Sequence, residues 1–332
     1  MADIRNELSG IWKRTRIVSD WDSSRFSWGK ASVCAQLSRI AYFPIPEFEF
    51  EERGRFKLIP CDLHYELIER KEFLTTERLR QADFGPTFII HGHYSVIVGV
   101  MIDSILFIAI RGTSALYKSS LFYDIGTDLN FIPITVNKYS REAKVKLHRG
   151  FFRAAAENIH SLRQEIRKIT TKYQDKIYIY ITGHSLGGAM AAILYELLSG
   201  HRSNDFECAV CKYGNNSNKQ LCDSYLNNYV YSAYCFGAPR YGNIWAISSF
   251  NRPYNIQHRR DPVPKLPPKI LGYSDGRCNK VIDERPCKEC GSRHHSGKLK
   301  NVILPYCVAS HRVEGYCKSV DLMALEQTPY KI

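Results

Sequence analysis

Residues 177–189 read Lys-Ile-Tyr-Ile-Tyr-Ile-Thr-Gly-His-Ser-Leu-Gly-Gly, a β-branched and aromatic run that leads into a glycine-flanked serine, and an alanine-rich segment follows. A strand, a turn with a central serine and a helix predict a nucleophile elbow, in which Gly183 and Gly187 let strand and helix approach closely. Ser185 is the predicted nucleophile; the alternative is a structural glycine-rich turn. Helix N-termini stabilise negative charge, so the Leu186 amide is a predicted oxyanion donor.

A serine nucleophile needs a general base and an acid that orients the base, and in α/β-hydrolases the Asp and then the His follow the serine along the chain. Asp261 stands after a strand-like run and directly before Pro262, which indicates a loop at the end of a strand. We therefore predict that Asp261 orients the base. Its alternative role is to form an Asp-Pro turn.

Three histidines follow Asp261, and one of them is the expected base. His294 and His295 lie in a charged stretch that looks like an excursion, whereas His311 lies near the end of the chain. We predict His311 as the base. His148 precedes the serine, which favours a structural ring that binds neighbouring loops, although it remains the rival base. His184 is expected to bind backbone, since adjacent residues on a sharp turn point apart.

Several further motifs occur in a fixed order along the chain. They are Ile108-Ala-Ile-Arg-Gly-Thr113, Leu147-His-Arg-Gly-Phe151, Gly183-His-Ser-Leu-Gly-Gly188, Cys235-Phe-Gly-Ala-Pro-Arg240, Asp261-Pro-Val-Pro264, and His311 followed by Tyr316. With these motifs the chain resembles the class 3 lipases, fungal triacylglycerol lipases and their bacterial and plant relatives, over about residues 27–325. The resemblance implies a Ser185, His311 and Asp261 triad, with Thr113 as the second oxyanion donor.

The order of the expected elements predicts the fold class. Apolar periodicity predicts a helix over 28–42, a hairpin from strands 94–101 and 105–110, a helix over 151–171 and a strand over 229–236. With the elbow this order predicts an α/β-hydrolase fold with a mostly parallel central sheet and helices on both faces. The 332 residues are expected to form a single domain, 1–332, with cysteine-rich insertions near 203–224 and 274–300.

The segment after Thr113 is longer than the usual short lid of the resembled family, and its residues are too apolar for an exposed loop. Its apolar residues alternate with lysine and serine, which predicts a lid that covers the site in water and opens on lipid. The alternative is an ordinary buried helix. The predicted lid residues are Leu116, Tyr117, Leu121, Phe122 and Tyr123.

The chain has 11 cysteines, and two pairs have the Cys-x-x-Cys spacing. Cys208 with Cys211, and Cys287 with Cys290, are predicted to bind a structural zinc ion. Disulfides and free thiols are the alternatives. The proposed catalysis requires no cofactor. Residues that could replace one zinc ligand are Cys222, Cys278, His294 and His295.

The formal net charge is +13, from 46 basic and 33 acidic residues. This excess favours contact with an anionic lipid interface, and the alternative is a solvated surface with no partner. No nucleic-acid partner is expected. The first residues lack the profile of a secretory signal, so the expected location is cytoplasmic, or exported without a Sec-type signal peptide.

These features predict a serine carboxylester hydrolase that cleaves lipid esters, in particular acylglycerols, through an acyl-enzyme. Phospholipase A-type hydrolysis of anionic phospholipids is the alternative within the same chemistry. From another class, a metal- or nucleic-acid-binding scaffold on an inactive hydrolase fold is considered. A complete set of catalytic residues argues against that scaffold.

Overall fold

A computed structural model describes residues 4–42, 87–92, 95–112, 133–135, 145–173, 176–199, 229–250, 253–276, 278–282 and 310–327. The helices are α1 (Ile4–Ile17), α2 (Trp28–Ile40), α5 (Arg149–Lys172), α6 (Leu186–Ser199), α8 (Ile244–Ser249) and α10 (Val313–Gln327), with 3-10 turns η2 (Val263–Lys265) and η3 (Lys269–Leu271). The strands are β1 (Thr87–His91), β2 (Val96–Ile102), β3 (Ile105–Ile110), β4 (Pro133–Thr135), β5 (Lys146–His148), β6 (Tyr178–His184), β7 (Val230–Phe236), β8 (Pro253–His258) and β9 (Cys278–Ile282).

Seven strands form the central sheet in the order β1-β2-β3-β6-β7-β8-β9. The β1-β2 and β2-β3 pairs are antiparallel, and the four pairs from β3 to β9 are parallel. The predicted mostly parallel sheet is therefore confirmed. In the parallel part, the carboxyl ends of all strands meet at one edge, where the catalytic loops begin.

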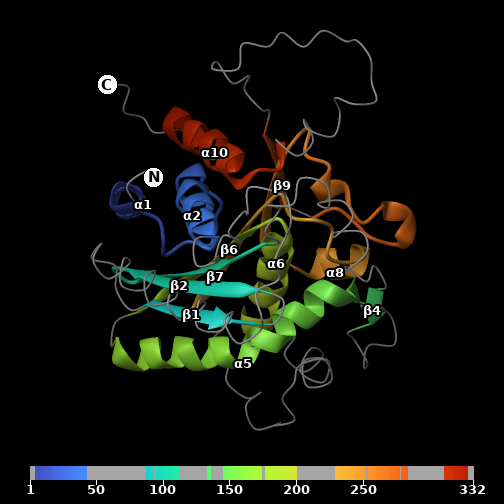
Figure 1. The fold of residues 1–332 in the computed structure, drawn as a ribbon, viewed down its shortest axis with the longest axis horizontal. Helices are drawn as coiled ribbons and strands as arrows, with labels where there is room; N and C mark the ends of the chain where they lie inside the picture. Colours follow the sequence, from blue (N-terminus) through green and yellow to red (C-terminus); the bar gives the residue numbers. More distant parts are fainter. Residues whose placement is uncertain are drawn as a thin grey trace, which may run out of the picture.

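Helices cover both faces of the sheet, as Figure 1 shows. Alternate residues of β3 take part in two separate cores: Leu106 and Ile108 pack with α5 and α6, and Phe107 and Ala109 pack with α1, α2 and α10. A strand that is buried on both faces has to be apolar at every position, and every residue of β3 is both apolar and buried. The predicted layers of an α/β-hydrolase fold are confirmed.

The predicted hairpin forms between β2 and β3, with its turn at Asp103 and Ser104. Asp103 has a φ of 52°, in the left-handed region that aspartate tolerates better than most residues. The helix expected over 28–42 starts at Trp28, because the Ser27 side chain accepts a hydrogen bond from the Lys30 amide.

The expected insertion near 274–300 needs a correction at its start. Residues Cys278–Ile282 form β9, which pairs with β8 in parallel and ends the central sheet. Cys278 is half-buried there as a free thiol. The rest of this segment, and the segment near 203–224, lie outside the described residues.

Within the described helices, none is both long and apolar enough to cross a bilayer.

Helix α10 packs Tyr316, Cys317 and Val320 into the core shared with α2, and one carboxylate adds polar links to α1 and α2. Asp321 of α10 accepts hydrogen bonds from Arg14 at 2.8 Å, from Ser32 and from Gln36 at 3.1 Å. Since Arg14 lies on α1 and the other two donors on α2, the three helices are linked at one point. This link fixes the helix that follows the predicted base.

Candidate active site

The turn between β6 and α6 is a nucleophile elbow. Ser185 lies between the two elements with a φ of 59°, a strained conformation for a residue with a side chain. Its amide donates to the Phe236 carbonyl of β7 at 2.8 Å, which ties the turn to the neighbouring strand. A Cβ at Gly183 would collide with the Gly187 backbone, and one at Gly187 with the Ile110 carbonyl. The close approach predicted at both glycines is therefore present.

The three predicted triad residues meet at this turn. His311 Nε2 lies 2.8 Å from Ser185 Oγ, and His311 Nδ1 lies 2.8 Å from Asp261 Oδ2. All three residues are buried. The histidine thus stands between nucleophile and carboxylate, with one ring nitrogen for each, which is the arrangement that acyl transfer by a serine requires.

The carboxylate of Asp261 is held in place by two further donors. The Val263 amide donates to Oδ1 at 2.9 Å, and the Tyr316 hydroxyl donates to Oδ2 at 2.7 Å. Gly237, with a φ of 56°, passes close to the same oxygen, where a side chain would crowd it. The carboxylate therefore has a single orientation toward His311.

Two buried histidines that do not touch the nucleophile's hydroxyl hold the backbone beside His311. His184 Nε2 donates to the His311 carbonyl at 2.6 Å, which leaves Nδ1 to accept from the Tyr42 hydroxyl at 2.9 Å. Burial lowers the pKa of His184 well below its ordinary value, so its ring stays neutral. The expectation that His184 binds backbone is confirmed.

His258 is the second of these histidines, and the sequence carried no signal for it. Its ring stacks on Tyr316 at 4.0 Å, and its amide donates to the Tyr316 hydroxyl at 3.0 Å. Its Nδ1 donates to the Ser310 carbonyl at 2.8 Å, and its Nε2 lies 3.0 Å from Ser319 Oγ. His258 therefore connects the end of β8 with both sides of the turn that carries His311.

We expect Tyr316→Phe to lower kcat about tenfold with little change in KM, because a hydrogen bond to a charged group contributes about 1.5–3 kcal/mol. The variant loses the bond that the hydroxyl donates to Asp261 Oδ2, which acts on kcat, and the bond that it accepts from the His258 amide, which acts on stability. Steady-state kinetics on a soluble ester measures the change. Tyr241→Phe is the matched control, since Tyr241 is also a buried tyrosine with a hydrogen-bonded hydroxyl. Equal losses of kcat in both variants would contradict a specific role for Tyr316.

His148, the rival base, caps a helix instead. Its Nδ1 accepts from the Phe151 amide at 3.4 Å as the N-cap of α5, and its ring stacks on Phe151 at 3.9 Å. Burial lowers the pKa of His148 to about 4, so the ring is neutral at pH 7. The structural interpretation of His148 fits these contacts.

The buried cap predicts a loss of stability in acid. Unfolded chains protonate His148 below about pH 6.5, whereas the folded protein resists protonation down to about pH 4. The contribution of the neutral His148 ring to the free energy of unfolding is therefore fully present above pH 6.5. It falls by roughly 3 kcal/mol as the pH falls toward 4. His148→Asn keeps a capping acceptor but no titrating ring. Urea unfolding at pH 7 and pH 4.5 should show a smaller loss in the variant; equal losses would exclude His148 as the cause.

The oxyanion site is described in part. Leu186 is the first residue of α6, where amides lack partners within the helix. A Cβ at Gly112 would lie 3.1 Å from the Ser185 Cβ, so the chain that leads to residue 113 passes beside the nucleophile. Thr113 itself lies outside the described residues, and its role stays a prediction.

The predicted lid and the predicted zinc ligands also lie outside the described residues. The lid residues are Leu116, Tyr117, Leu121, Phe122 and Tyr123, and the zinc ligands are Cys208, Cys211, Cys287 and Cys290. Within the described part of the chain, no group of three or more His, Cys, Asp or Glu residues is placed to hold a metal ion. Lid and zinc both stay predictions.

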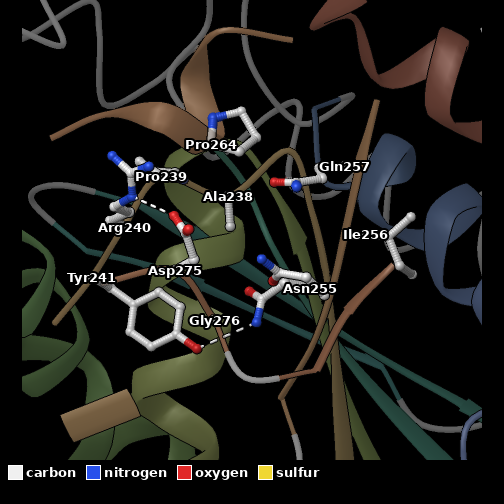
Figure 2. A pocket seen from close by; sticks show the side chains of 11 residues that line it. Ala238, Pro239, Arg240, Tyr241, Asn255, Ile256, Gln257, Pro264, Asp275 and Gly276 are labelled. Atoms are coloured by element: carbon white, nitrogen blue, oxygen red, sulfur yellow. Dashed lines mark hydrogen bonds and ion pairs between the residues drawn. The ribbon is translucent and has the colours of Figure 1, made fainter. Parts of the chain in front are cut away.

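Figure 2 shows a pocket between the loops that follow β7 and β8, lined in part by Arg240, Tyr241, Asn255 and Asp275. Arg240 and Asp275 point toward each other across it and form an ion pair at 2.6 Å. Its volume of about 10 Å³ is that of roughly one water molecule. This pocket is therefore too small for an acyl chain, and the ion pair across it joins the two loops.

The family model described as "Lipase (class 3)" matches residues 107–271. A "Secreted mono- and diacylglycerol lipase 1" of Fusarium solani is 27% identical over 131 residues, which cover 38% of this chain and 31% of the relative. A "Lipase" of Rhizomucor miehei is 26% identical over 208 residues, 61% of this chain and 50% of the relative. Its structure in complex with its propeptide superposes with a TM-score of 0.41 at 22% identity, over 61% of this chain and 58% of that one.

A "Phospholipase A1-II 1" of Oryza sativa subsp. indica is 29% identical over 130 residues, which cover 37% of this chain and 27% of the relative. The chain thus spans half or less of the length of these curated relatives. The family match runs from β3 through the elbow and the Asp261 loop as far as η3. It includes Ser185 and Asp261, and His311 lies beyond it.

Proposed function

The chain belongs to the class 3 lipase family, and from this premise we propose that it is a serine carboxylester hydrolase that cleaves acylglycerols. One observation carries the proposal. Ser185 Oγ, His311 and Asp261 form a continuous chain of hydrogen bonds with 2.8 Å at each link. Such a chain activates a hydroxyl that is otherwise a poor nucleophile.

The reaction proceeds through an acyl-enzyme. Ser185 Oγ attacks the ester carbonyl while His311 Nε2 takes the hydroxyl proton, and the same nitrogen then returns a proton to the leaving alcohol. Asp261 Oδ2 accepts a hydrogen bond from His311 Nδ1–H throughout, and the carboxylate stabilises the charged imidazolium. Water, activated by His311, then attacks the acyl group and releases the fatty acid.

The negative charge on the carbonyl oxygen requires donors in the transition state. The Leu186 amide supplies one at the N-terminus of α6, and we propose the Thr113 amide and hydroxyl for the other. A single oxyanion donor is worth about 3 kcal/mol of transition-state stabilisation. This chemistry needs no metal, so we assign the proposed zinc a structural role only.

Covalent labelling and a substrate panel test the proposal together. A fluorophosphonate probe should label Ser185 alone, as read by peptide mass spectrometry, because only an activated serine reacts. The purified protein should release fatty acid from mono-, di- or triacylglycerol emulsions. Labelling of Ser185 without release from any acylglycerol would keep the serine hydrolase but reject the substrate class.

Phospholipase A-type hydrolysis is the second candidate. The net charge of +13 favours anionic headgroups, and one of the relatives above carries the name of a phospholipase. The same panel, extended to phosphatidylglycerol and phosphatidylcholine, separates the two candidates. Faster release from the anionic phospholipid than from any acylglycerol would favour the phospholipase.

A further inference from the structure

Four large apolar side chains are exposed on two neighbouring short elements. Ile244 and Trp245 of α8 are 56% and 54% exposed, and Ile270 and Leu271 of η3 are 92% and 48% exposed. Isolated exposed apolar residues need no explanation, but a local group of this size does. We call these four residues the apolar rim.

The two elements of the apolar rim are joined through their loops. The Ser274 amide donates to the Gly242 carbonyl at 2.9 Å. Trp245 lies three residues after Gly242 and Leu271 three residues before Ser274, so each Cα is within about 11 Å of this hydrogen bond. The two elements of the apolar rim are therefore tethered to each other at one point of the fold.

Ion pairs and backbone hydrogen bonds fix the loops beneath this surface. The Arg240 amide donates to the Leu266 carbonyl at 2.6 Å, and its guanidinium donates to the Pro267 carbonyl at 2.9 Å. The same guanidinium pairs with Asp275, as Figure 2 shows. A rigid base lets exposed apolar side chains insert into a partner with little loss of backbone entropy.

Both loops begin at the catalytic residues. The loop after β7 starts at Phe236, whose carbonyl accepts the Ser185 amide, and continues past Gly237, which lies beside Asp261. The loop after β8 contains Asp261 itself. The apolar rim thus belongs to the two loops that leave the catalytic edge of the sheet.

Basic residues accompany the apolar rim. The described residues 238–250 and 253–276 contain five lysines and arginines against two aspartates, and Asp261 is buried. Asp275 pairs with both Arg240 and Lys269, so no uncompensated carboxylate remains exposed on these two stretches. The exposed basic residues are Arg259, Arg260, Lys265 and Lys269.

We propose that the apolar rim, with its surrounding lysines and arginines, is a docking surface for an anionic phospholipid membrane. Trp245 and Ile270 enter the boundary between headgroups and acyl chains, and the basic side chains contact the phosphates. Docking there brings the catalytic edge of the sheet to the lipid surface. The inference rests on the proposed function for its purpose, because a lipid hydrolase has to reach its substrate at an interface.

Vesicle binding by an inactive enzyme tests the surface independently of catalysis. In a Ser185→Ala background, binding to vesicles of phosphatidylglycerol and phosphatidylcholine is measured by co-sedimentation. Trp245→Ser with Ile270→Ser should weaken binding about tenfold or more, because interfacial affinity scales with the apolar area that is buried. In the active enzyme, turnover of a short, soluble ester should stay unchanged in this double variant.

A matched control uses exposed apolar residues elsewhere. Ile17 at the end of α1 is 71% exposed and Leu325 near the end of α10 is 70% exposed. Ile17 follows Arg16, which binds Asp103 in the β2-β3 turn, at the edge of the sheet opposite the triad. Ile17→Ser with Leu325→Ser should keep vesicle affinity within about twofold. Equal losses in both double variants would overturn the proposal.

A second, independent test varies the charge of the lipid. Lys265→Gln and Lys269→Gln should each weaken binding to the anionic vesicles about fivefold. Binding to pure phosphatidylcholine should be weak and insensitive to both changes. Equal binding to both vesicle types would overturn the anionic membrane as partner. Sedimentation velocity tests the other occupant. If the wild-type protein is a dimer that Trp245→Ser with Ile270→Ser dissociates, and if it does not bind vesicles, the surface is assigned to a second copy of the chain.

Discussion

Replacing Ser185 by alanine is expected to lower ester turnover roughly 10⁵- to 10⁶-fold while the protein stays folded, because the acyl-enzyme can no longer form. Within the described residues, the side-chain hydrogen bond of Ser185 Oγ is the one to His311. The folded protein therefore loses one hydrogen bond at most. Single-turnover and steady-state assays on a soluble ester measure the loss, and a thermal melt checks the fold.

His311→Ala should cost about as much as Ser185→Ala, and the double variant should cost hardly more than either single one. The serine and the histidine act as a unit, so their contributions to turnover do not add. His148→Ala serves as the control, since His148 binds the Phe151 amide and not the nucleophile. Full activity in His311→Ala with loss in His148→Ala would reverse the assignment of the base.

The triad could be predicted from the sequence because each member either stands in a recognisable local pattern or follows the other members in the expected order along the chain. Ser185 stands between a strand-like and a helix-like run, and Asp261 precedes a proline. His311 followed from its position after both. The structure brings the three together at 2.8 Å contacts that no spacing in the sequence specifies.

The contacts of the supporting residues could not be predicted in the same way, although Tyr316 stood in one of the quoted motifs. His258 and Tyr316 are 58 positions apart in the chain, and their contact depends on β8 and α10 meeting in three dimensions. Likewise, β9 has four polar or half-exposed positions out of five, because it lies at the edge of the sheet, so periodicity gave no strand there. Edge strands and tertiary hydrogen bonds leave weak marks in a sequence.

The hydrogen bonds around Asp261 determine what an amide would do in its place. Oδ1 accepts the Val263 amide at 2.9 Å, a donor that cannot turn away because it is backbone. Oδ2 faces the His311 ring nitrogen and the Tyr316 hydroxyl. The hydroxyl can rotate, so that it accepts a hydrogen bond from an NH₂ group instead of donating one to the carboxylate. An asparagine at this position therefore keeps its oxygen toward Val263 and points its NH₂ group at His311.

Asp261→Asn should consequently lower turnover about 10⁴-fold with little loss of stability, because the NH₂ group forces His311 Nδ1 to accept. The ring proton then sits on Nε2 and faces Ser185 Oγ, so the ring cannot take the hydroxyl proton. Kinetics on a soluble ester measures the loss, and ¹⁵N NMR of the imidazole should report the changed tautomer. Asp275→Asn is the matched control, since that aspartate pairs with Arg240 and Lys269 away from the triad. An unchanged tautomer together with the full loss of activity would show that the carboxylate acts through its charge rather than by orienting the proton.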